Sequence, residues 1–143
     1  MDKIPNSRSI EVLIFEGVNI LDVAGPVQAF EAARYKDQRI YTHRYVSLDG
    51  KPMRASCGLL LTPDQSLSSS SNADLLIPGG CVDPLLYDSK LLDAVAAKAR
   101  EKGDGRLISI CSGALILAAA GVLDGQIATT HWSREEIAVR KYP

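Results

Sequence analysis

Short apolar segments that alternate with helical patterns set the strongest limit on how this chain of 143 residues folds. Each of three such segments is rich in β-forming residues, and each leads into a stretch with helical spacing. The strands are expected at 9–15, 73–80 and 106–110, and the helices after them at 20–35, 89–102 and 113–121. Apolar strands joined by helices predict an α/β fold, a mostly parallel sheet with helices on both faces. Ligands of such sheets bind beyond the carboxyl ends of the strands.

Smaller elements fill the middle of the chain. We expect a strand followed by a turn over 41–50, a second short strand over 58–67, and an exposed serine-rich loop over 66–73. Within the first helical stretch, Pro26 follows a glycine, which predicts that the regular helix begins at Pro26.

The last part of the chain predicts one more strand and one more helix. A brief strand is expected over 126–132, and a polar helix over 133–142. Ser133 is predicted as the N-cap of this helix, with Glu136 at the capping-box position.

Composition limits the function classes. The length predicts a single domain over 1–143, and the net charge of −1 gives no sign of a nucleic-acid or anionic-membrane partner. The sequence has no apolar run long enough for a membrane span, and its first residues lack the apolar core of a signal peptide. We therefore expect a cytoplasmic location. The three cysteines lack metal-binding spacing and there are only two histidines, so we expect no metal and no cofactor.

The segment "LISICSGALILAAAG" places Cys111 where a predicted strand turns into a predicted helix. This pattern resembles a nucleophile elbow, in which a sharp turn exposes a reactive side chain. The helix N-terminus would favour a thiolate, so we expect the thiol to ionise below its reference pKa of about 8.5. The alternative is a small buried cysteine that only packs.

Neighbouring residues supply possible partners for such a nucleophile. The Ser112 backbone N–H and the glycine pair Gly79–Gly80 after a predicted strand could donate to an oxyanion, although a glycine pair is also an ordinary strand-end turn. Asp22 could act as an acid or simply stabilise the start of a helix. His131 could act as a base or be a structural histidine.

Taken together, these motifs resemble the ThiJ/PfpI superfamily, which is related to class I glutamine amidotransferases. The matching residues run along most of the chain, in "GVNILDVAGP", "LLIPGG", "ICSGA" and "AAAGVLDGQIATTHW". The wording of the last motif is similar to the N-terminal domain of GlxA-type AraC-family transcriptional regulators and also to isonitrile hydratases. "CSGA" and the closing "EEIAVRKYP" favour the regulators.

The resemblance implies a fold and a set of roles. It implies a flavodoxin-like three-layer sandwich that lacks C-terminal elements, with no helix-turn-helix domain and no nucleic-acid contact by this chain, and a homodimer. Catalytic positions fall on Cys111, Asp22 and His131. The oxyanion or ligand pocket falls on Gly79, Gly80 and the Ser112 N–H.

Three functions remain open at this point. The first is a sensor module that binds a small molecule around Cys111 without converting it, as part of an AraC-family regulator. The second is a cysteine-dependent hydratase or hydrolase that acts on a small electrophile such as an isonitrile. The third is a family member in which Cys111 only packs.

Overall fold

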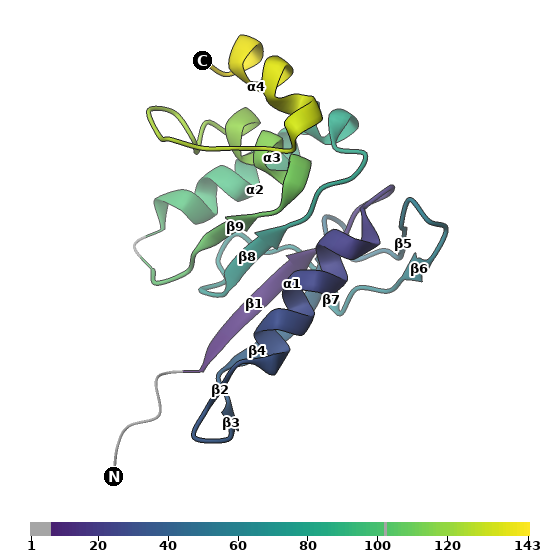
Figure 1. Ribbon diagram of the computed structural model, residues 1–143, viewed down its shortest axis with the longest axis vertical. Helices are drawn as coiled ribbons and strands as arrows, with labels where there is room; N and C mark the ends of the chain where they lie inside the picture. The colour runs from purple at the N-terminus through teal and green to yellow at the C-terminus, as the bar shows by residue number, and fades with distance from the viewer. Residues whose placement is uncertain (1–6, 102) are drawn as a thin grey trace.

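A five-stranded sheet forms the centre of the computed structural model, which describes residues 7–101 and 103–143 (Figure 1). The strands lie in the order β7-β4-β1-β8-β9. They span Gln65–Ser66 (β7), Tyr41–Ser47 (β4), Arg8–Leu13 (β1), Asp74–Ile77 (β8) and Leu107–Ser109 (β9). Every pairing within this sheet is parallel, which confirms the predicted α/β fold of flavodoxin-like type.

The central strands are covered on both faces. All four residues of β8 are buried, and so are the last four of β1. Successive side chains of a strand point to opposite faces, so an unbroken buried run requires packing on each side of the sheet. Apolar side chains of β1 and β8 therefore form the middle of the core, with Val12 paired to Leu76.

Helices provide this cover. The α-helices span Ile20–Ala32 (α1), Ser89–Arg100 (α2), Ala114–Ala119 (α3) and Glu135–Lys141 (α4). The 3-10 helices span Asp83–Tyr87 (η1), Cys111–Gly113 (η2) and Trp132–Arg134 (η3). Helix α1 contacts β4, whereas α2 packs against α3 and η1. In Figure 1, α4 lies at the top beside the C-terminus.

Helix α1 begins earlier than the sequence predicted. Its first residue is Ile20, because the Asn19 side chain accepts a hydrogen bond from the Leu21 amide and so caps the helix. Pro26, where the start was expected, lies inside the helix. The early start places Asp22 in the first turn, at the carboxyl end of β1.

Apart from β4, the strands in the middle of the chain are each two residues long. The antiparallel pair Arg34–Tyr35 (β2) and Gln38–Arg39 (β3) follows α1, and Met53–Arg54 (β5) pairs with Leu60–Leu61 (β6). The strand expected over 58–67 is thus divided into β6 and β7, which belong to different sheets.

Two predictions for the C-terminal part are wrong. Residues 126–130 form no strand, and Ile127 within them is fully exposed, so it has no core contact to stabilise a strand there. Ser133 is not the N-cap of the last helix. Instead, the His131 side chain accepts a hydrogen bond from the Ser133 amide at the start of η3.

Two buried carboxylates on the sheet are paired with cations. Asp74 accepts hydrogen bonds from the guanidinium groups of Arg8 and Arg106, which hold the pKa of its carboxyl far below the usual range despite burial. Glu11 on β1 lies 3.5 Å from Lys98 Nζ of α2. Each pair joins segments that are distant in sequence, so both contribute to fixing the sheet and α2 in register.

Candidate functional site

The turn at Cys111 connects the end of β9 to α3. Ile110 is extended, and Cys111 then has a φ of +57°, which a non-glycine residue adopts only at an energetic cost. The Ile110 amide donates to the carbonyl of Ile77 at 3.0 Å, and this bond anchors the turn on β8. We call residues 109–113 the Cys111 turn.

Gly113 allows the Cys111 turn to lie close to β8. A Cβ atom at this position would lie 2.2 Å from the Ile77 carbonyl oxygen, so only glycine fits without moving the backbone. The sharp turn expected at Cys111 therefore depends on the glycine at position 113.

Asp22 reaches the Cys111 turn from the first turn of α1. Its Oδ2 atom accepts a hydrogen bond from the Gly79 amide at 3.1 Å. A Cβ atom added at Gly79 would lie 2.7 Å from Asp22 Oδ2, 2.8 Å from Ser112 Oγ and 2.9 Å from Cys111 Cβ. Gly79 is therefore the point where the side chains of Asp22, Cys111 and Ser112 meet.

The glycine amides that we expected to bind an oxyanion are already engaged. The Gly79 amide donates to Asp22, and the Gly80 amide donates to the buried Ser112 Oγ at 3.1 Å. Ser112 is thus involved through its hydroxyl as well as through the backbone amide that the sequence indicated. A pocket role for Gly79 and Gly80 stays a prediction, and their amides are not free donors in this structure.

The ionisation of Cys111 runs opposite to the sequence-based expectation. Burial raises the pKa of the Cys111 thiol, and the nearby negative charge of Asp22 raises it further. The Ser112 amide, which donates to the sulfur, lowers the pKa but does not reverse the shift.

The His131 ring is hydrogen-bonded within its own segment. Its Nδ1 atom lies 2.8 Å from Ser133 Oγ and also accepts from the Ser133 amide at 3.2 Å. Within the described residues, no hydrogen bond links its ring to Cys111, and a catalytic role for His131 stays a prediction. The preceding residue contacts the Cys111 turn, since Thr130 Oγ1 donates to the Cys111 carbonyl at 3.2 Å. No pattern in the sequence singled out Thr130.

A groove of about 390 Å³ lies beside the Cys111 turn. Its walls come from α3, from 123–130 and from α4, and Thr130 belongs both to the groove and to the contact with Cys111. Most of the lining is apolar, including Leu115, Leu123 and Tyr142, while Asp124 and Glu135 add polar groups. Such a volume and lining suit a small organic ligand.

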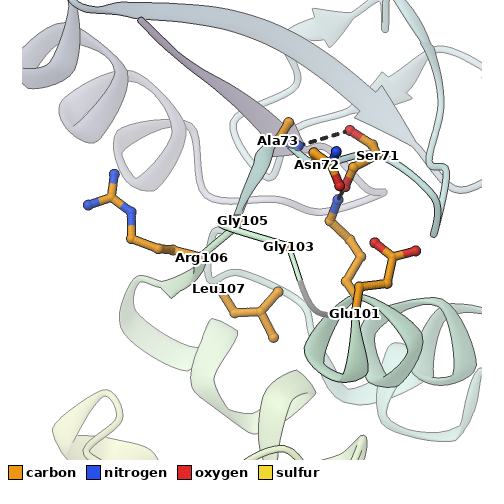
Figure 2. A pocket seen from close by; sticks show the side chains of 9 residues that line it. Ser71, Asn72, Ala73, Glu101, Gly103, Gly105, Arg106 and Leu107 are labelled. Carbon is orange, nitrogen blue, oxygen red and sulfur yellow. Dashed lines mark hydrogen bonds between the residues drawn. The ribbon is translucent and has the colours of Figure 1, made fainter. Parts of the chain in front are cut away.

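A second, much smaller hollow lies at the opposite end of the sheet, before the first residues of β8 and β9 (Figure 2). Lys98 reaches into it and donates from Nζ to the Ser71 carbonyl at 2.7 Å. The Ala73 amide donates to Ser71 Oγ, as the dashed line shows. These bonds tie Lys98 and Ala73 to Ser71, so this hollow belongs to the folded framework rather than to the site.

Within residues 7–101 and 103–143, no group of three or more histidine, cysteine, aspartate or glutamate side chains is placed to hold a metal ion. None of the helices there is long and apolar enough to cross a membrane.

The sequence model of the DJ-1/PfpI family matches residues 8–142. A Streptomyces lividans protein described as an uncharacterized protein in the cpoL 5' region is 37% identical over 142 residues, which are 94% of each chain. Isonitrile hydratase of Pseudomonas putida is 34% identical over 130 residues, covering 90% of this chain and 54% of the hydratase.

Regulators also appear among the relatives. The HTH-type transcriptional regulator GbdR of Pseudomonas aeruginosa is 30% identical over 129 residues, covering 89% of this chain and 35% of the regulator. Among solved structures, a THiJ/PfpI family protein from Pseudomonas syringae superposes with a TM-score of 0.74 at 29% identity, over 93% of this chain and 55% of that one. The chain therefore spans about half or less of the hydratase and the regulator, and nearly all of the Streptomyces protein.

Proposed function

The chain belongs to the DJ-1/PfpI family, and from that premise we propose that it is a small-molecule-sensing module of an AraC-type transcriptional regulator, with its ligand held beside Cys111. The similarity to GbdR supports the regulator branch, since 89% of this chain aligns with about a third of that protein. The groove beside the Cys111 turn supports a ligand role, because its volume and mixed lining suit a small organic molecule.

One observation carries the choice of binding over turnover. Both glycine amides next to Cys111 donate to protein groups, Gly79 to Asp22 and Gly80 to Ser112, so neither is directed at a reacting oxygen. An enzyme that stabilises an oxyanion needs such donors free and preorganised. The raised pKa of Cys111 agrees, because a neutral thiol is a poor nucleophile near pH 7.

A second candidate is a cysteine-dependent enzyme that hydrates a small electrophile. The 34% identity to isonitrile hydratase favours it, together with the placement of Asp22 beside the Cys111 thiol. In this candidate Cys111 adds to the electrophilic carbon, and the Ser112 amide beside the sulfur is the backbone donor nearest to that carbon.

The two candidates are separated by binding and turnover measured on the same protein. A panel of small metabolites is screened by thermal shift, and cyclohexyl isocyanide is incubated with the wild-type chain and with Cys111→Ser. Saturable stabilisation by a metabolite, with no isocyanide consumed, supports the sensor. Consumption that Cys111→Ser abolishes replaces the sensor with the enzyme, and an absence of both effects contradicts both candidates.

Two further properties belong to this proposal. We expect a homodimer and a cytoplasmic location, and we expect this chain itself to make no nucleic-acid contact. Analytical ultracentrifugation tests the homodimer, and a gel-shift assay with random-sequence DNA tests the absence of nucleic-acid contact.

A further inference from the structure

Thr130, the residue before His131, makes a side-chain hydrogen bond to the backbone of the Cys111 turn. Its Oγ1 atom donates to the carbonyl oxygen of Cys111 at 3.2 Å, across 19 positions of sequence. Thr130 is partly buried, whereas its neighbour Thr129 is exposed. In the part of the chain that the structure describes, the Thr129 side chain makes no hydrogen bond, which makes it a matched control.

The peptide bond between Cys111 and Ser112 links this contact to the thiol. The Cys111 carbonyl and the Ser112 amide are two ends of one trans peptide plane, and they point in opposite directions. The Ser112 amide donates to the Cys111 sulfur and lowers the pKa of the thiol. A group that fixes the carbonyl end of this plane therefore also fixes the amide end relative to the sulfur.

The Cys111 turn needs such support because its backbone is strained. Cys111 has a φ of +57°, and a left-handed conformation costs about 1–2 kcal/mol in a residue with a side chain. A strained conformation persists only where surrounding contacts hold it. Thr130 supplies one of these contacts from outside the turn and from outside the sheet.

We propose that Thr130 is a positioning residue, which holds the Cys111–Ser112 peptide so that the Ser112 amide stays directed at the Cys111 sulfur. This inference rests on the proposed function only in taking Cys111 as the centre of the site. Thr130 also forms part of the groove wall, so it connects the space for a ligand to the group that tunes the thiol.

The test is the pH dependence of Cys111 alkylation by iodoacetamide, followed by mass spectrometry in the full chain. Thr130→Val keeps the shape of the side chain and removes the hydroxyl, and we expect it to raise the Cys111 pKa by about 0.5–1 unit. The alkylation rate below that pKa falls by about 3- to 10-fold as the thiolate fraction drops. Thr130→Ser keeps the hydroxyl and should give the wild-type alkylation profile. Thr129→Val should also leave the alkylation profile of Cys111 unchanged.

A purely structural role for Thr130 gives a different result. In that case Thr130→Val lowers the urea midpoint, while the alkylation profile of the folded protein matches that of Thr129→Val, and the proposal is overturned. The proposal is also overturned if Thr130→Ser, which keeps the hydroxyl, shows the same altered alkylation profile as Thr130→Val. The alkylation test needs no ligand, so it is independent of the metabolite screen. If the Thr130 proposal fails, the thermal-shift test of the sensor function still stands. If no metabolite stabilises the protein, the alkylation result for Thr130 still stands.

Discussion

Replacing Gly79 by alanine tests whether the side chains around Cys111 are as closely packed as the structure places them. The added Cβ atom would lie 2.7 Å from Asp22 Oδ2, 2.8 Å from Ser112 Oγ and 2.9 Å from Cys111 Cβ. All three separations are shorter than van der Waals contact, so the three side chains must move apart. Gly79 does not have a left-handed backbone, so the penalty comes from collision alone.

The magnitude follows from two opposing contributions. Forcing a methyl group into a packed site costs about 1–3 kcal/mol, and the smaller conformational entropy of the unfolded chain returns about 0.4–1 kcal/mol. We therefore expect Gly79→Ala to lower the free energy of unfolding by about 1–2 kcal/mol. The displaced Asp22 carboxylate also changes the pH profile of Cys111 alkylation.

Gly25 provides the matched control for Gly79→Ala. It lies inside α1, and a Cβ atom there would meet nothing within 4 Å. Gly25→Ala should raise the free energy of unfolding by about 0.5–1 kcal/mol, since alanine favours the helix. Urea titration of both variants measures the difference. If Gly79→Ala is as stable as Gly25→Ala and leaves the alkylation profile unchanged, the close packing of the site is refuted.

Other predictions concern charge. Asp22→Asn removes a negative charge that raises the pKa of Cys111, so the alkylation midpoint should shift to lower pH, and an upward shift would contradict this electrostatic assignment. Asp74 is buried against Arg8 and Arg106, so Asp74→Asn should cost about 3 kcal/mol of stability at pH 7 in urea titration. Because folding depresses the pKa of Asp74, its contribution is complete above the unfolded value of about 3.9 and is lost as the pH falls further. Wild-type stability should therefore decrease below about pH 4 more steeply than that of Asp74→Asn, and parallel curves would contradict the pairing.

The parallel α/β arrangement and the position of Cys111 could be predicted because both depend on local patterns. Apolar runs followed by helical spacing indicate parallel strands, and a cysteine between a strand and a glycine-containing helix start indicates a sharp turn. The structure has β9 and α3 on either side of Cys111. By contrast, Ile127 lies in the segment 126–132, where a strand was expected, but its side chain is fully exposed and has no core contact to stabilise a strand.

The hydrogen bonds of the site could not be predicted because they depend on distances between separate segments. The sequence indicates that the amides of Gly79 and Gly80 lie near Cys111, but not that Asp22 and Ser112 accept hydrogen bonds from them. The pKa of Cys111 is a further example. A local argument counts only the helix start, whereas burial makes the largest contribution to the Cys111 pKa and Asp22 on α1 adds to it.

These contacts together determine what the site can do. Four segments converge at Cys111: the start of α1, the loop after β8, the Cys111 turn and Thr130. All four contribute groups to the hydrogen bonds that hold the site together. The Asp22 carboxylate accepts a hydrogen bond from the Gly79 amide through Oδ2, and its negative charge favours the neutral form of the Cys111 thiol. Ligand binding needs only this neutral, hydrogen-bonded arrangement, whereas turnover needs the Cys111 thiol to lose its proton against that negative charge, and this difference favours the small-molecule-sensing function that we propose.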